Sequence, residues 1–247
     1  MAIKSLWISV IAIAASFTVG FLLANTLNRS KFEALIKENE HWKNAASGAI
    51  RNGSDLTLSN DEIQKKIAEA DQYPHNFEFQ KNLGLALYRY AALKQDIQLL
   101  WEAIRILQRG LSLDKNDYDL QVGVGNAYFD VGYFQKDNAG FEKAREYYLN
   151  ALVKKPGDVE VRTDLGLSYY LQQPPDLTRA AAEFEESLKT NPKHEKTLQF
   201  LIQALIKQNR VSEAAKYLDQ LKIANPANQS IAELNSLITQ TLVTSEK

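Results

Sequence analysis

Hydrophobic residues follow two different patterns along this chain. Residues 5–24 form an uncharged, mainly apolar run, SLWISVIAIAASFTVGFLLA. From residue 59 onward, apolar positions recur at helical spacing with polar residues between them. A helix of about 20 residues spans roughly 30 Å, the thickness of the hydrocarbon core of a bilayer. The first pattern therefore predicts a transmembrane signal-anchor helix within residues 1–28, and the second predicts a series of amphipathic helices.

The charges beside the apolar run bear on its orientation. Lys4 precedes the run, whereas Arg29, Lys31, Lys37 and Lys43 follow it, and this excess of positive charge favours a cytoplasmic C-terminal part. A short tail before a long apolar run is also the usual form of a signal anchor, which sends the C-terminal part outward. We expect an uncleaved anchor with the following residues outside the cytoplasm. A cleaved secretory signal, which would leave a soluble periplasmic protein, remains the alternative.

A polar segment separates the anchor from the periodic part of the chain. Residues 31–46 have a helical composition, and residues 47–58, SGAIRNGSDLTL, are rich in Ser, Gly and Asn. We interpret residues 29–58 as a juxtamembrane helix and a linker. Ser59 precedes Glu62 at the spacing of a capping box, which predicts a lone helix over residues 59–73.

Two fixed intervals recur through the rest of the chain. Four alanines are each followed after four residues by a large side chain and after twelve by a proline or a lysine: Ala103, Leu107 and Lys115; Ala144, Tyr148 and Pro156; Ala180, Phe184 and Pro192; Ala214, Leu218 and Pro226. Ten residues beyond Pro74, Lys115, Pro156 and Pro192 come Gly84, Gly125, Gly166 and Ile202.

Each interval has a physical reason. Small residues let the two helices of a hairpin approach closely, and the large residues fill the space beside that contact. Proline ends the second helix because it has no backbone N–H and disfavours helical geometry in the residue before it. The intervals therefore predict helical hairpins at residues of about 77–116, 117–157, 158–193 and 194–227.

These residues resemble the tetratricopeptide repeat (TPR) family. LGLAL, VGNAY and LGLSY match the first-helix signature, AREYY and AAEFE match the second, and GLSLDKND, ALVKKPGD and SLKTNPKH match the hairpin endings. The resemblance implies an all-α TPR-like helical-hairpin solenoid, a right-handed superhelix, over residues 59–226. Residues 228–247 would then hold a C-terminal capping helix and tail, with one apolar face made of Ile231, Leu234, Leu237, Ile238 and Leu242.

The first two hairpins are longer than the family's usual hairpin. The Gly-to-Ala interval is 19 residues in both and 14 in the third, whereas the last repeat has the usual 12 from Ile202 to Ala214. The first extension is compatible with helix throughout, which predicts an elongated hairpin. The second contains Gly132 and the sequence Asp137-Asn138-Ala139-Gly140, which favours a protruding loop.

In this family the first helices of successive repeats line a concave groove that binds partner peptides or helices. By register, the groove residues here would be Lys81, Asn82, Leu85, Tyr88, Arg89, Val122, Asn126, Phe129, Asp130, Thr163, Asp164, Leu167, Tyr170, Gln199, Phe200, Gln203 and Ile206. Alternatively, some of Tyr88, Phe129 and Tyr170 pack between repeats. Lys81 matches one position of the carboxylate clamp that binds chaperone tails, but Glu160 and Asp164 occupy other clamp positions, so we expect no such binding.

The amino-acid composition excludes several kinds of functional site. Lys plus Arg number 29 and Asp plus Glu number 30, so the chain has no excess of positive charge that would indicate nucleic-acid binding. The absence of cysteine excludes thiol nucleophiles, disulfides and Cys-containing zinc sites. His41, His75 and His194 lack metal-ligand spacing and are interpreted as solvated surface residues. We therefore expect no enzyme activity, no cofactor and no metal.

The sequence thus predicts a single-pass membrane protein that presents a protein-binding scaffold. The resemblance to membrane-anchored bacterial TPR proteins implies the inner membrane, a soluble part outside the cytoplasm, and a role as assembly factor for an envelope complex, such as cytochrome c maturation or secretion. A homo-oligomeric platform, a non-catalytic regulatory subunit of a membrane-bound enzyme, and an enzyme with a site outside these motifs remain open.

Overall fold

The computed structural model describes residues 59–245, and the chain divides into two units, residues 1–66 and 67–247. The boundary lies within the first described helix, α3 (Asn60–Gln72). At its start, the Glu62 amide donates to Ser59 Oγ at 3.3 Å and the Ser59 amide donates to Glu62 Oε2 at 3.0 Å, which is the predicted capping box. The expected anchor and linker, residues 1–58, lie outside the described residues. None of the helices from α3 onward is both long enough and apolar enough for a membrane span.

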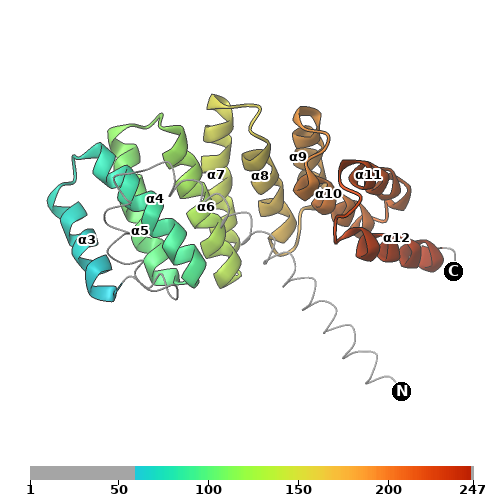
Figure 1. The fold of residues 1–247 in the computed structure, drawn as a ribbon, viewed down its shortest axis with the longest axis horizontal. Coiled ribbons are helices and arrows are strands. Elements are labelled where there is room, and N and C mark those ends of the chain that lie inside the picture. The colour runs from blue at the N-terminus through green and yellow to red at the C-terminus, as the bar shows by residue number, and fades with distance from the viewer. Residues whose placement is uncertain (1–58, 246–247) are drawn as a thin grey trace, which may run out of the picture. The chain divides into compact units, whose positions relative to one another are not determined.

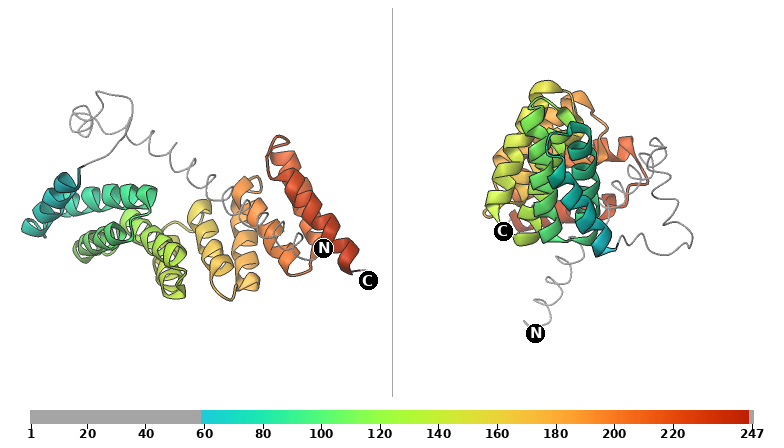
Figure 2. Two further views of the ribbon diagram at one scale, coloured as in Figure 1. Left: turned by 90° about the horizontal axis from the view of Figure 1, so that it is seen from below. Right: turned by 90° about the vertical axis from the view of Figure 1, so that its left-hand side faces the viewer.

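The second unit is a succession of antiparallel helical hairpins, and its described residues form no strands (Figure 1). The hairpins follow one another in chain order in the left-hand view of Figure 2. The second helix of each hairpin also packs on the first helix of the next. The helices are α4 (Phe77–Lys94), α5 (Ile97–Leu113), α6 (Tyr118–Gln135), α7 (Asn138–Lys154), α8 (Val159–Leu171), α9 (Leu177–Thr190), α10 (Glu195–Lys207), α11 (Val211–Ala224) and α12 (Ile231–Ser245).

Side-chain caps fix where most of these helices begin. Asx oxygens accept hydrogen bonds from backbone amides at the starts of α4 to α9, at Asn76, Asp96, Asp117, Asp137, Asp158 and Asp176. Such caps stabilise a helix by about 1 kcal/mol each. The turns of the two long hairpins are closed by Gln95 and Lys136, both in the left-handed conformation with φ of 55°.

The predicted close approach is confirmed in the three hairpins that carry a glycine at this position. A Cβ added at Gly84 would lie 2.7 Å from Leu107 Cδ2, and one added at Gly125 would lie 2.8 Å from Tyr148 Cδ1. In the third hairpin, a Cβ on Gly166 would lie 2.6 Å from Phe184. Each large residue therefore packs directly over the glycine of its own hairpin.

The hairpin tips confirm one prediction and correct another. The first hairpin is elongated as predicted, because α4 and α5 run to a tight turn at Gln95 and Asp96. The protruding loop predicted in the second hairpin is wrong, since α6 continues to Gln135 and α7 begins at Asn138. Its glycines serve helix contact instead of a loop.

The last helix buries only part of its predicted apolar face. Leu234 and Ile238 are buried against the preceding repeat, and Ile231 packs at the edge of the same core. Leu237 and Leu242, expected on the same face, are 37% and 45% exposed. The α12 helix therefore covers the end of the core and leaves apolar side chains in solvent.

Candidate functional site

The predicted groove residues lie on the helices α4, α6, α8 and α10, which pack in succession and form what we call the first-helix face. Among the residues named for the groove, Asn82 is exposed, whereas Tyr88 and Tyr170 are buried. The half-buried ones are Lys81, Arg89, Asn126, Phe129, Asp130, Asp164, Gln199 and Gln203. The face is therefore mostly polar at its surface, with aromatic rings beneath.

The three aromatic residues named for the groove pack against other helices of the protein. The Tyr88 hydroxyl on α4 lowers the pKa of Asp130 on α6, and burial raises the pKa of the Tyr88 hydroxyl well above its ordinary value. Tyr170 donates to Gln203 Oε1 at 3.1 Å. Phe129 lies edge-to-face on Phe141. These side chains hold neighbouring helices together more than they offer contact area to a partner.

Polar residues of the face are also bound by neighbouring helices, between repeats at Lys81 and within one hairpin at Asn126. Lys81 on α4 makes ion pairs with Asp117 at 2.7 Å and Asp119 at 2.8 Å, both at the start of the next hairpin. Asn126 Oδ1 accepts a hydrogen bond from the Tyr148 hydroxyl at 2.9 Å. Lys81 and Asn126 are thus already engaged, which sequence register alone does not reveal.

The two acids at the clamp positions already have partners within the protein. Lys196 on α10 lies 2.7 Å from Asp164 Oδ1 and 3.9 Å from Glu160 Oε2. His194 Nε2 lies 3.1 Å from Glu160 Oε1. A partner's carboxylate would therefore meet two acids here, and the cation that could attract it is already paired.

Asp130 differs from these groups. Burial raises the pKa of its carboxyl to about 7, and the negative charge of Asp164 adds to this rise, while the Tyr88 hydroxyl opposes it. No ion pair in the part of the chain that the structure describes involves Asp130. It is a half-buried acid on the first-helix face with a hydroxyl partner but no cation.

The structure corrects the interpretation of His194 as a solvated residue. It is half-buried, and its Nδ1 lies 2.6 Å from Thr197 Oγ1 while its Nε2 contacts Glu160. This connectivity is that of an acid–histidine–hydroxyl chain. Thr197 is fully buried and its hydroxyl also contacts Thr163 at 2.6 Å, so no substrate could reach it.

This network of hydrogen bonds connects α8, α9 and α10, and we call it the polar joint. Thr163 Oγ1 and Ser187 Oγ lie 3.1 Å apart, and Ser187 Oγ donates to the Val159 carbonyl at 3.1 Å. Sequence reasoning missed the network because its members are 10 to 34 residues apart. Within residues 59–245, no group of three or more acidic or histidine side chains could hold a metal ion.

Comparison with known proteins identifies the kind of repeat. Two sequence models, both described as tetratricopeptide repeat, match residues 135–195 and residues 175–238. Among proteins of curated function, no sequence matches the chain significantly.

Solved structures share the fold. A crystal structure of MamA is 20% identical over 66% of this chain and 86% of that one, with a TM-score of 0.54. MamA from Desulfovibrio magneticus RS-1, from residue 41 to its end, is 17% identical over 77% and 97%, with a TM-score of 0.56. A thermophilic TPR protein from Thermus thermophilus is 14% identical over 73% and 89%, with a TM-score of 0.50. At these identities the likeness establishes the fold.

Proposed function

We propose that this chain, a tetratricopeptide-repeat protein, acts as a scaffold or adaptor. In this proposal its first-helix face binds a segment of a partner protein. Tetratricopeptide repeats mediate protein–protein interaction. The exposed Asn82 supplies an amide that can hydrogen-bond to a partner's backbone, and Gln199 keeps its Oε1, because its Nε2 donates to Asn228 Oδ1 at 3.0 Å.

The observation that carries this proposal is the state of Asp130. A carboxyl that is half-buried, beside a second acid and without a cation, is held in an unfavourable state when it ionises. A lysine or arginine from the partner would supply the missing positive charge. Asp130 would then be the residue that selects a basic side chain in the bound segment.

In vivo photo-crosslinking tests this proposal. A photoreactive amino acid at exposed position 82 should trap a partner, and Asp130→Asn in the same protein should reduce the yield of that adduct several-fold. The matched control is Asp114→Asn, which lies in a loop away from the first-helix face. An adduct whose yield is the same with Asp130→Asn would contradict the proposal.

We further propose that residues 5–24 anchor the chain in the bacterial inner membrane and that the repeats lie outside the cytoplasm, where they serve assembly of an envelope complex such as cytochrome c maturation or secretion. Retention in the membrane pellet after an alkaline wash tests the anchor. Protease cleavage after only the outer barrier is opened tests the orientation. Protection until lysis would place the repeats in the cytoplasm.

Exposed apolar residues favour a second candidate, a homo-oligomeric platform. Leu237, Leu242 and Val243 on α12 are 37%, 45% and 55% exposed, and a second copy could cover them. Light scattering of the full-length chain and of a Leu237→Gln, Leu242→Gln variant tests this. A monomer in both would exclude self-association through α12.

A further inference from the structure

Four residues of the first-helix face hold the same position in successive repeats. Each comes five residues after the position that Gly84 marks in the first repeat and Ile202 marks in the last. On α4, α6, α8 and α10 this position holds Arg89, Asp130, Leu171 and Lys207, which we call the register row. Because these four helices pack in succession, the row presents a positive, a negative, an apolar and a second positive side chain in that order.

The three charges of the register row have no opposite charge beside them. No ion pair among residues 59–245 involves Arg89, Asp130 or Lys207. Burial lowers the pKa of the half-buried Arg89 guanidinium and of the Lys207 ammonium. Each charge is therefore partly removed from water and lacks a counter-charge, which a ligand can supply.

The groups around the two cations leave them available. Asp119, the acid whose charge acts on Arg89, is already paired with Lys81 at 2.8 Å. The Lys207 ammonium lies over the Tyr170 ring, 4.1 Å from its centre, so an aromatic face holds it in place and no acid neutralises it. Both cations thus remain free to pair with carboxylates of a ligand.

Amides on α6 and α10 favour a ligand with an accessible backbone. Asn126 and Gln203 lie one helical turn before the charged residues of the register row on these helices. The Tyr148 hydroxyl donates to Asn126 Oδ1 at 2.9 Å, and the Tyr170 hydroxyl donates to Gln203 Oε1 at 3.1 Å. The NH2 group of each amide is left to donate to a ligand. An extended segment offers backbone carbonyls for this, whereas those of a helix are engaged within the helix.

The spacing of the repeats sets the spacing of side chains in such a segment. The axes of packed helices lie about 8–10 Å apart. A polyproline II segment has about three residues per turn and a rise of about 3.1 Å per residue, so one turn spans about 9 Å. Every third side chain points to the same side, and each can therefore meet the next helix of the face.

We propose that the partner segment crosses the first-helix face as a polyproline II-like strand and carries an acidic, a basic, an apolar and an acidic side chain at every third position. The inference rests on the function proposed for this face and specifies its ligand. The two acidic groups pair with Arg89 and Lys207, and the basic group pairs with Asp130. The apolar group packs on Leu171, which is half-buried at the edge of the core. A segment with the opposite charges would place like charges together and be rejected.

Fluorescence anisotropy with the full-length chain tests the proposal. The probe is a fluorescein-labelled peptide with the pattern Glu-x-x-Lys-x-x-Leu-x-x-Glu, in which x is serine or proline. The row does not set the direction of the backbone, so the peptide with the reverse order is also measured and the tighter of the two is used. We expect saturable binding that weakens as salt is added. Arg89→Glu and Asp130→Asn should each weaken it about tenfold.

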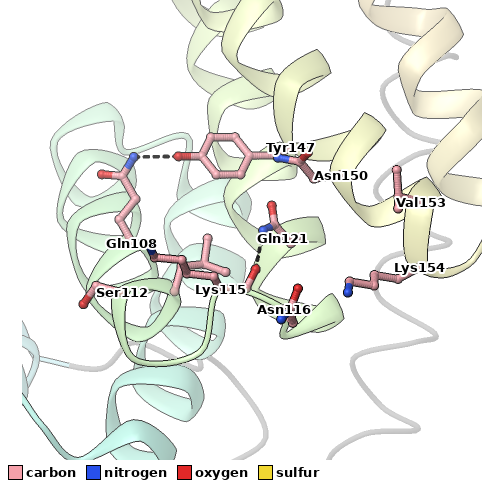
Figure 3. Close-up of a pocket in the computed structure, with 10 residues that line it drawn as sticks. Gln108, Ser112, Lys115, Asn116, Gln121, Tyr147, Asn150, Val153 and Lys154 are labelled. Atoms are coloured by element: carbon pink, nitrogen blue, oxygen red, sulfur yellow. Dashed lines mark hydrogen bonds between the residues drawn. The ribbon is translucent and has the colours of Figure 1, made fainter.

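A charge exchange provides the matched comparison. A peptide in which one terminal glutamate is replaced by lysine should bind Arg89→Glu more tightly than it binds the natural protein. The control is Lys154→Glu on α7, which lines a cleft beside α5 and does not belong to the first-helix face (Figure 3). It makes the same change of charge and should leave binding of the original peptide within about twofold.

Three outcomes would overturn the proposal. The first is equal binding of the probe and of a peptide in which lysine and glutamate are exchanged. The second is tighter binding when the same four side chains are about seven residues apart, because about seven helical residues span about 10 Å and a helix would then occupy the face. The third is no saturable binding of either patterned peptide. If an adduct at position 82 still depended on Asp130 in that case, the proposed function would stand and only the charge pattern would be wrong.

Discussion

Gly132 on α6 and Gly140 on α7 touch backbone to backbone at the tip of the second hairpin. A Cβ added at Gly140 would lie 2.5 Å from both the Cα and the nitrogen of Gly132, and one added at Gly132 would lie 2.9 Å from the Phe141 nitrogen. Backbone atoms cannot move aside as a flexible side chain can. The two glycines are therefore what allows α6 and α7 to remain helical up to a turn of two residues.

Substitution of this contact should cost stability. Gly140→Ala forces the tip of the hairpin apart, and overpacking of this kind costs about 2 kcal/mol. In a chain of this size that corresponds to a decrease of roughly 5 °C in Tm, measurable by circular dichroism. Gly157→Ala is the control, because its Cβ would meet only Thr190 Cγ2 at 3.8 Å. Equal Tm values for the two variants would contradict the account of the contact.

Asp130 should make stability depend on pH. Its pKa is about 7 in the folded state and has an ordinary value of 3.8, so the folded chain binds more protons than the unfolded chain between these values. Stability contributed by this group is therefore present at low pH and is lost as pH rises towards and through 7. Above that pH the ionised carboxyl destabilises the fold, by an amount on the order of 4 kcal/mol.

Asp130→Asn removes this ionisation and keeps an oxygen for the Tyr88 hydroxyl. We expect the variant to be more stable than the natural protein at pH 8, and the difference to be less than half as large at pH 5, because most of the stability is recovered between pH 7 and pH 5. Urea unfolding at the two pH values measures it. Asp114→Asn, in the exposed loop after α5, serves as control. A difference that is the same at both pH values would show that Asp130 titrates normally.

Much of the fold could be predicted because hairpin contacts recur at fixed sequence intervals. The small residues at positions 84, 125 and 166 and the large residues at 107, 148 and 184 meet as their spacing indicated. The prediction at Gly132 and Gly140 was wrong because glycine suits both a turn and a close helix contact. The sequence shows only that a side chain is absent, and the partner that requires its absence is known once both helices are placed.

The site was less predictable because its interactions join different repeats. Register placed Lys81, Asp130 and Asp164 on one face, but it could not show that Lys81 and Asp164 are paired with residues of the next repeat while Asp130 is not. Nor does helical periodicity distinguish a buried threonine from a buried valine. Thr163 and Thr197 occupy apolar positions, and only their mutual distance reveals a polar joint.

The hydrogen bonds of the polar joint should contribute to stability in a coupled way. Thr197→Val removes a partner of both Thr163 Oγ1 and His194 Nδ1 and keeps the side-chain volume. A buried polar group left without a partner costs about 1–3 kcal/mol, so we expect a loss of that size in urea unfolding. In the double variant with Thr163→Val, both ends of the shared hydrogen bond are apolar, and the combined loss should be smaller than the sum of the single losses. Strict additivity in this double-mutant cycle would mean that the 2.6 Å contact contributes nothing, and the network would then be a consequence of packing and not a cause of it.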